Sequence, residues 1–122
     1  MLIKLDDYVN ALVEICHREA SNAGWWKGVD IEDISVVPAK LCLIHSEISE
    51  AMEGHRKDLM DDHLPTRKMV EVELADAMIR IADLAGEMGL DLGGAVIDKL
   101  AYNRTRSDHK LENRSKANGK AY

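Results

Sequence analysis

The chain has 122 residues, of which 46% are hydrophobic and 31% charged, and its formal net charge is −6. This length allows one domain with a modest core, and because Phe is absent the core must consist mainly of aliphatic residues and Met, which favours helix over sheet. No apolar run approaches the roughly 18 residues that span a bilayer, and an acidic chain is a poor general binder of nucleic acid polymers.

The charge is unevenly distributed along the chain. Residues 99–122 contain seven Lys and Arg against two acidic residues, a net charge of +5, which leaves −11 for residues 1–98. An acidic chain of this kind could still bind a small polyphosphate if cations bridge the acidic site and the phosphates. The two cysteines, Cys16 and Cys42, fall in apolar periodic stretches, and the start of the chain has no signal-peptide pattern. We therefore expect buried free thiols and a cytoplasmic protein.

The first predicted helix covers residues 5–20, where apolar residues recur at amphipathic spacing. Residues 25–37 have no sustained period and contain both tryptophans, Trp25 and Trp26, followed by Lys27. Each tryptophan has two interpretations. It fills a gap between helices, or it stacks on a nucleobase while Lys27 meets a phosphate.

A second helix is predicted over residues 38–59, with Pro38 in its first turn, where the missing N–H costs nothing. Glu47 and Glu50 project from a flank beside the core. The expected core-facing stripe is apolar and consists of Leu41, Ile44, Ile48 and Met52.

The third predicted helix, residues 66–88, has one polar strip about 80° wide on an otherwise apolar surface. The strip consists of Glu73, Asp76, Arg80, Asp83 and Glu87. A helix that is apolar around most of its circumference should be central and packed on several sides, so the strip should line a cleft. Asp76 and Arg80 have the spacing of an ordinary ion pair within the helix.

A fourth helix is predicted over residues 91–107, with Asp91 as its N-cap. Lys99, Asn103 and Arg106 share one face of it at i, i+4, i+7 spacing. The polar residues 111–122 should form a flexible tail after a single domain over residues 1–110. The expected fold is therefore all-α, a bundle of four to five helices, and so thin a core is often completed by homo-oligomerisation.

Two pairs of carboxylates, Glu47 with Glu50 and Glu73 with Asp76, are the strongest chemical signal. A spacing of three residues places both members of a pair on one helix face, and two antiparallel helices could direct all four at one point. Four converging negative charges require a cation, and oxygen ligands suit Mg²⁺, Mn²⁺ or Ca²⁺. Neither pair continues into the Glu-x-x-His motif of di-iron bundles, and no activated nucleophile is recognisable. Any chemistry should therefore be metal-assisted attack by water.

These motifs resemble the MazG-like all-α nucleoside triphosphate pyrophosphohydrolases. The resemblance covers roughly residues 5–109. It depends on Leu-Cys-Leu-Ile-His-Ser-Glu-Ile-Ser-Glu-Ala at 41–51, Glu-Leu-Ala-Asp-Ala-Met-Ile-Arg-Ile-Ala-Asp-Leu at 73–84, and Lys99-x-x-x-Asn103. Ser46 stands where many relatives have a further Glu. The short chain is similar to the compact members found in phages and mobile elements.

The resemblance implies hydrolysis of a (deoxy)nucleoside triphosphate to the monophosphate and pyrophosphate. It assigns Mg²⁺, or Mn²⁺, to four metal ligands, namely Glu47, Glu50, Glu73 and Asp76. Glu47 or Glu50 is the better candidate for the catalytic base. Substrate binding would fall to Lys99, Asn103, Arg106, Lys27, Trp25 and Trp26. The resemblance also implies a homodimer or a dimer of dimers. Two alternatives stay open: a non-catalytic helical interaction module, and hydrolysis of phosphoribosyl-ATP.

Overall fold

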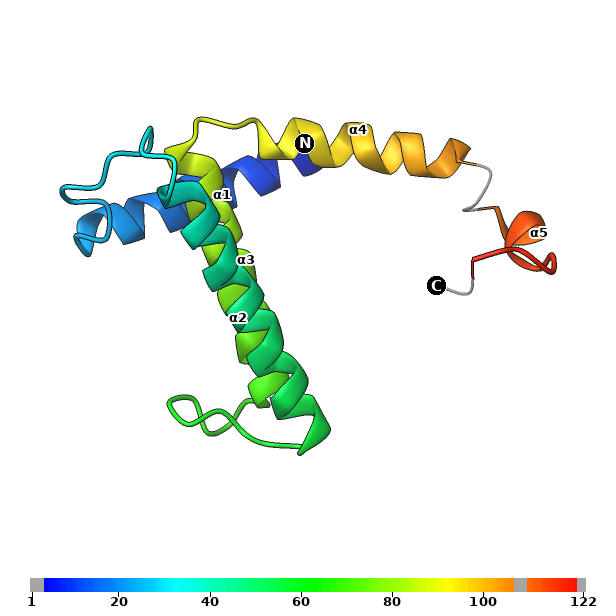
Figure 1. Cartoon of the computed structure of the whole chain (residues 1–122), viewed down its shortest axis with the longest axis horizontal. Coiled ribbons are helices and arrows are strands. Elements are labelled where there is room, and N and C mark those ends of the chain that lie inside the picture. Colours follow the sequence, from blue (N-terminus) through cyan, green and yellow to red (C-terminus); the bar gives the residue numbers. More distant parts are fainter. Residues whose placement is uncertain (1–3, 107–109, 121–122) are drawn as a thin grey trace. The chain divides into compact units, whose positions relative to one another are not determined.

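The computed structural model describes residues 4–106 and 110–120, and these residues form five α-helices and no strand (Figure 1). The helices are α1 (Leu5–Asn22), α2 (Val36–Arg56), α3 (Met69–Glu87), α4 (Leu92–Thr105) and α5 (Leu111–Arg114). The prediction of an all-α chain is therefore confirmed for this part of the protein. None of these helices combines the length and apolarity needed to cross a bilayer.

The helix boundaries differ from the predicted ones where the loops use backbone hydrogen bonds. α2 ends at Arg56 rather than residue 59, because Asp58 takes a left-handed φ of 50°. α3 begins at Met69 rather than residue 66, because the Met69 N–H donates to Leu59 O across the loop. Pro38 lies in the first turn of α2, as predicted. The predicted end of the fourth helix, Ser107, lies outside the described residues.

The chain divides into two compact units, Ala11–Leu90 and the combination of the residues up to Asn10 with those from Asp91 onward. We call these the central unit and the terminal unit. The prediction of one domain over residues 1–110 with a tail over 111–122 stays a prediction. In the terminal unit, Asp91 caps α4 by accepting the Gly94 N–H, as predicted, and it also accepts a hydrogen bond from the Asn10 side chain. The Asn10 amide oxygen in turn accepts the Gly93 N–H.

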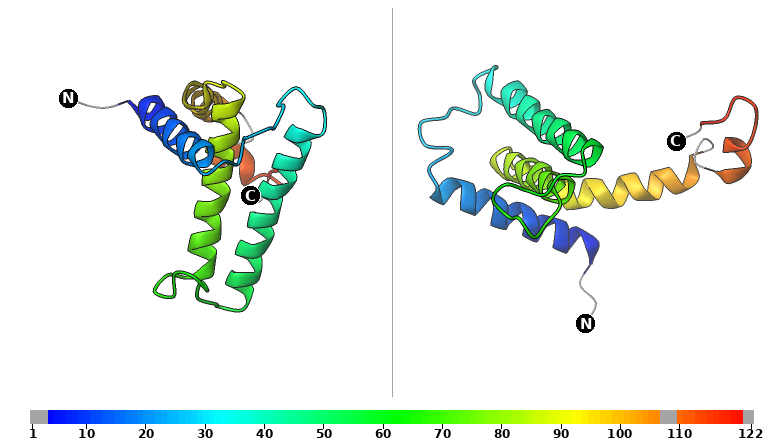
Figure 2. Two further views of the ribbon diagram at one scale, coloured as in Figure 1. Left: turned by 90° about the vertical axis from the view of Figure 1, so that its left-hand side faces the viewer. Right: turned by 90° about the horizontal axis from the view of Figure 1, so that it is seen from below.

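The central unit is built on α2 and α3, which run side by side and antiparallel (Figure 2). Gly54 near the end of α2 meets Met69 at the start of α3, and Glu47, two turns earlier, meets Arg80, three turns later. The residues that α2 buries are Glu47, Ala51 and Gly54. Because two of these three have little or no side chain, the two helix backbones approach closely.

Polar contacts attach α1 and the loop after it to α3. Asp83 Oδ1 accepts the indole N–H of Trp26 at 2.8 Å and lies 3.1 Å from His17 Nδ1. His17 Nε2 lies 3.2 Å from Glu87 Oε2. The buried hydrophobic residues are mostly small: Val13, Cys16, Trp26, Ala51, Ala77, Ala82, Leu84 and Ala85. The predicted burial of Cys16 is confirmed, whereas Cys42 is exposed.

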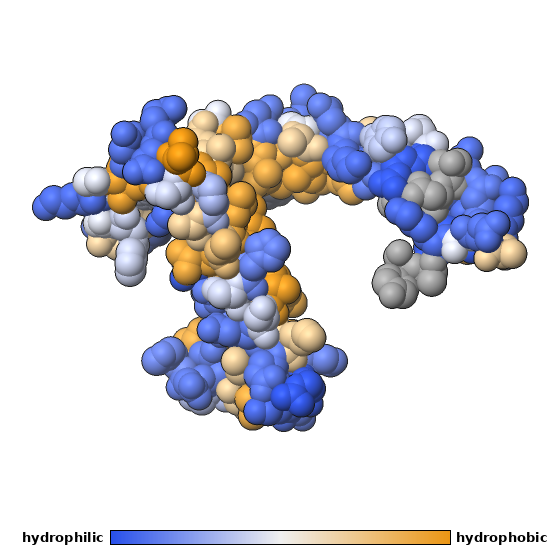
Figure 3. All heavy atoms as spheres, in the orientation of Figure 1, coloured by the Kyte–Doolittle hydropathy of each residue, from blue (hydrophilic) through white to orange (hydrophobic). Residues whose placement is uncertain are grey.

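The predicted apolar stripe of the second helix is wrong as a core-facing surface for three of its four residues. Leu41, Ile48 and Met52 are 47%, 48% and 66% exposed, because α2 turns Glu47 and its small residues toward α3 instead. Ile44, the fourth, is half-buried. α3 is likewise not enclosed, since Leu74 and Met78 are about half exposed. Figure 3 shows hydrophobic surface, coloured orange, along part of this helix pair. Within a single chain, α2 and α3 therefore have apolar faces that no described element covers.

The close approach of α2 and α3 makes Gly54 sensitive to substitution. A Cβ added there would lie 2.7 Å from both Met69 Cβ and Met69 Cγ. We expect Gly54→Ala to lower the free energy of unfolding by about 1–3 kcal/mol, although alanine favours helix by about 1 kcal/mol. Urea unfolding measures the change. Ser49→Ala, at an exposed position of α2, is the matched control and should be neutral or slightly stabilising. An unchanged or increased stability of Gly54→Ala would contradict the observed packing.

Candidate metal centre

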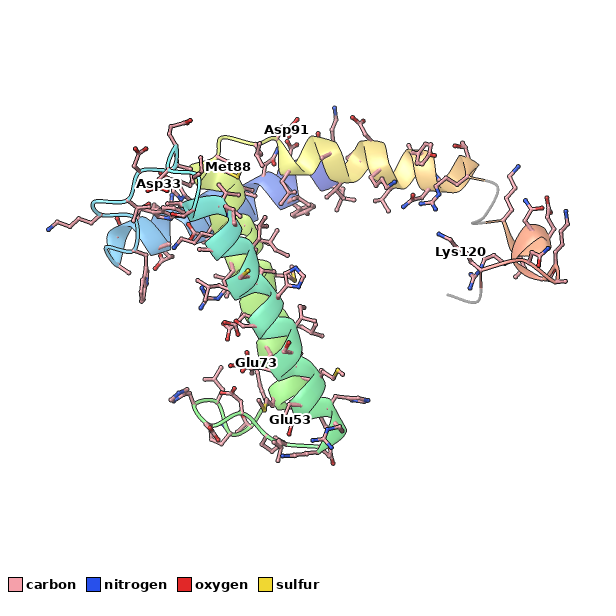
Figure 4. All side chains as sticks on the ribbon, viewed as in Figure 1. Asp33, Glu53, Glu73, Met88, Asp91 and Lys120 are labelled. Carbon is pink, nitrogen blue, oxygen red and sulfur yellow. The ribbon has the colours of Figure 1, made fainter. Side chains whose placement is uncertain are left out.

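Three carboxylates converge between α2 and α3. One oxygen each from Glu47, Glu73 and Asp76 lie within 4.8 Å of one another, and Glu73 is labelled along the helix pair in Figure 4. A cation bound at about 2.0–2.6 Å separates its ligand oxygens by up to about 4–5 Å, so small side-chain rotations suffice to place all three on one ion. The helix pair therefore brings together three of the four predicted ligands.

Glu73 carries the strongest indication that this cluster takes a ligand. Glu73 is only 8% exposed, and its Oε2 is buried without a hydrogen-bond partner. A buried carboxyl oxygen without a partner is costly, and native structures seldom contain one that no water, ion or other group satisfies. A hard divalent cation would satisfy this atom, and the donor set contains only oxygen. The residues present thus fit Mg²⁺ or Mn²⁺.

The electrostatics of the cluster depend on burial and on repulsion among the carboxylates. Burial, together with interactions with Glu47 and Glu50, raises the pKa of Glu73 to about 8. Burial and the charge of Glu47 also raise the pKa of Asp76. Burial opposes ionisation of Glu47 as well, but hydrogen bonding with Glu73 and Arg80 lowers the pKa of Glu47 below its ordinary value. A cation would therefore displace a proton from Glu73 on binding.

Glu50, the fourth predicted ligand, is exposed at the edge of the cluster. It acts on both buried glutamates, because its carboxylate raises the pKa of Glu73 and hydrogen bonding with it lowers that of Glu47. The roles of Glu50 as a metal ligand and as a candidate catalytic base stay predictions. The predicted Asp76–Arg80 ion pair is replaced by a contact between helices, in which Arg80 Nε donates to Glu47 Oε1 at 2.8 Å.

A cavity of about 590 Å³ in the central unit adjoins the carboxylates. Glu47 and three members of the predicted polar strip, Asp76, Arg80 and Asp83, line it, so the prediction that the strip lines a cleft is confirmed for these three. Cys16 also lines it, and burial with the nearby Asp83 raises the pKa of that thiol, which disfavours the nucleophilic thiolate. The volume falls within the range of about 300–1,000 Å³ that is typical of small-molecule sites.

Of the aromatic and basic residues predicted to bind substrate, Trp25 lines the cavity and is 69% exposed. Trp26 is buried, with its N–H bonded to Asp83 and Lys40 Nζ 4.5 Å above its ring. These contacts agree with the gap-filling interpretation of Trp26. Lys27 is exposed and does not line the cavity. Stacking on a nucleobase thus stays a prediction, and Trp25 is the tryptophan whose ring is exposed at the cavity.

The predicted phosphate-binding residues of the fourth helix belong to the terminal unit. Lys99 Nζ lies 4.7 Å from the centre of the Tyr102 ring, and Arg106 Nη1 donates to Asn103 Oδ1 at 3.4 Å. Their roles toward a substrate stay predictions.

The sequence analysis missed Lys40 as a cavity residue. Lys40 precedes Glu47 by two helical turns, at i, i+7 spacing, and both line the cavity. That spacing from a predicted metal ligand was the signal that could have identified it.

Comparison with models of known families, with curated proteins and with solved structures gives no match. The resemblance stated from the motifs therefore stays a prediction.

The raised pKa of Glu73 predicts how stability depends on pH without divalent cations. Between its ordinary value of 4.5 and about 8, folded Glu73 keeps a proton that the unfolded state releases. The free energy of unfolding should thus fall as pH rises from about 5 to about 8, and Asp76 adds with the same sign. Glu47, with a lowered pKa, is ionised in both states over this range. We expect Glu73→Gln to flatten the dependence, measured by urea unfolding in EDTA.

The matched control is Glu71→Gln, an exposed position on α3 whose carboxylate pairs with Arg67. It should shift the stability at every pH without changing the slope. A wild-type stability that is constant or rises over this pH range would contradict the assigned environment of Glu73.

Proposed function

We propose that the chain hydrolyses (deoxy)nucleoside triphosphates to the monophosphate and pyrophosphate with Mg²⁺, or Mn²⁺, as cofactor. The observation that carries the proposal is the partnerless buried oxygen of Glu73, placed with Glu47 and Asp76 beside a cavity of ligand size. The motif resemblance to MazG-like enzymes agrees with this chemistry. A bound Mg²⁺ supplies three things: a lowered pKa for water, a hold on phosphate oxygens, and neutralisation of charge in the transition state.

The candidate site residues have separate roles in this proposal. Glu47, Glu73 and Asp76 hold the cation, with Glu50 joining from the edge, and Glu47 or Glu50 accepts the proton of the attacking water. The water oxygen bonds to phosphorus at the α–β anhydride and the bridging P–O bond breaks, which releases pyrophosphate. Trp25 offers a stacking surface for a base, which selects no particular base because every base has a π-face. For Lys99, Asn103 and Arg106, which belong to the terminal unit and do not line the cavity, binding of phosphate or sugar is what the resemblance alone implies.

We also propose that the protein works in the cytoplasm as a homodimer or a dimer of dimers. The support for assembly is the set of exposed apolar side chains on α2 and α3, among them Ile48, Met52, Leu74 and Met78. Burying such surface against a second copy would supply the core that one chain lacks.

The proposal predicts pyrophosphate release from a panel of canonical and modified dNTPs and NTPs with Mg²⁺. Glu47→Gln and Asp76→Asn should lower kcat by about 100-fold or more, because each removes a charged cation ligand. Circular dichroism should show an intact helical fold for both. Asp62→Asn, an exposed acid in the loop before α3, is the control and should retain wild-type turnover. Phosphoribosyl-ATP belongs in the panel. Its hydrolysis alone would identify the related activity instead.

A non-catalytic helical interaction module is the second candidate, and the exposed apolar faces of α2 and α3 favour it. The two hypotheses differ in metal binding. If the site holds a cation, Glu73→Gln should weaken Mn²⁺ binding by about 10-fold or more, measured by calorimetry, because it removes the buried charged ligand. The interaction module predicts no effect of this substitution on Mn²⁺ affinity. Folded wild-type protein that neither binds Mn²⁺ nor releases pyrophosphate would exclude the enzyme.

A further inference from the structure

Arg80 occupies a special place in the central unit. It follows Asp76 by one turn of α3, its Nε donates to Glu47 Oε1 at 2.8 Å, and its side chain is 42% exposed. Arg80, Asp76 and Glu47 all line the same cavity. One oxygen of a candidate metal ligand is thus bonded to a cation that the protein itself supplies.

This ion pair conflicts with a divalent cation on the same carboxylate. The guanidinium cannot deprotonate, so a cation bound by Glu47, Glu73 and Asp76 would face a fixed positive charge a few ångströms away. The guanidinium and the divalent cation would both bind the carboxylate of Glu47, whose burial strengthens electrostatic interactions. Arg80 therefore either weakens cation binding or moves away from Glu47 when the cation binds.

We propose that Arg80 competes with the divalent cation for Glu47 and that, once the cation holds Glu47, the Arg80 guanidinium binds a phosphate group of the substrate. This inference rests on the proposed function and deepens it by assigning a substrate-positioning residue outside the predicted set. The exchange needs only rotation of a half-exposed side chain that already borders the cavity.

A second cationic side chain borders the same cavity as Arg80. Lys40, from α2, lines the same space, so a triphosphate there would meet two cationic side chains in addition to the metal. The planar fork of arginine binds phosphate oxygens in a bidentate manner, which lysine cannot reproduce. Arg80 would thus exchange one negatively charged partner, Glu47 Oε1, for another, the phosphate oxygens. This exchange would couple cation binding to substrate binding.

The proposal predicts opposite effects of one substitution on two affinities. Arg80→Met should tighten Mn²⁺ binding without nucleotide by about 3- to 10-fold, because the competing charge is gone. It should weaken binding of a dNTP with a methylene α–β bridge, in the presence of Mg²⁺, by about 10- to 100-fold. Calorimetry measures the Mn²⁺ affinity, and competition against a fluorescent nucleotide measures the second.

Two further variants separate this role from general effects. Arg56→Met makes the same change at a residue of α2 that pairs with Glu53 and does not line the cavity, so both affinities should equal the wild type. Arg80→Lys keeps the charge without the fork. It should leave Mn²⁺ affinity near the wild-type value and restore only part of the nucleotide affinity. Urea unfolding of each variant shows that the protein measured is folded.

The outcomes distinguish this inference from the proposed function. If folded Arg80→Met or Arg80→Lys binds Mn²⁺ more weakly than the wild type, Arg80 orients Glu47 for the cation and the competition is wrong. If Mn²⁺ binding tightens but nucleotide affinity is unchanged, the phosphate role is wrong. A wild-type protein that binds no Mn²⁺ overturns the metal centre and this inference together, before any variant is compared.

Discussion

The arrangement of the central unit depends on how closely α2 and α3 approach each other. Gly54 and Ala51 give α2 almost no side-chain bulk on the face it turns to α3, and Met69 comes against Gly54 with no room for a Cβ. At such a separation, a larger side chain on the same face of α2 must lie between the two helices. Glu47 is that residue, and Glu73 enters from the opposite helix. The packing of small residues therefore forces the two buried carboxylates together, and removal from water raises the cost of ionising both.

Such an arrangement works against stability in the absence of a cation. The cluster has one ion pair, between Glu47 and Arg80, but Glu73 Oε2 is left without a partner, and the pKa of Glu73 is raised to about 8. Local rules of folding favour an apolar pair at these positions, and proteins usually depart from such rules where a site requires it. A solvated acidic surface would have no reason to bury these groups. The burial, more than the number of acids, distinguishes this cluster from a charged helix face.

The sequence predicted the features that depend on one helix at a time. The spacing of Glu73 and Asp76 placed both on the polar strip of α3, and Asp91 was recognised as a cap because its role is local. Features that depend on which faces meet were harder to predict. The apolar residues of α2 suggested a core-facing stripe, yet the small residues set the contact, since hydrophobic periodicity does not reveal whether a face meets its own chain. The partner of Arg80 changed from Asp76 to Glu47 for the same reason, because a contact across helices is invisible to spacing within one.

The exposed apolar faces and the acidic cluster lie on the same two helices and must be explained together. If α2 and α3 served only to present an interaction surface, the residues between them could be apolar, and the helix pair would be more stable for it. If they served only as a metal site, the outer faces could be polar, which would keep a single chain soluble by itself. Ile48 directly follows Glu47, and Leu74 directly follows Glu73, so each helix joins a buried acid to a half-exposed apolar neighbour. A second copy packed on these apolar neighbours would hold α2 and α3 in the orientation that brings the acids together. Assembly and cation binding would then stabilise the same pair of helices.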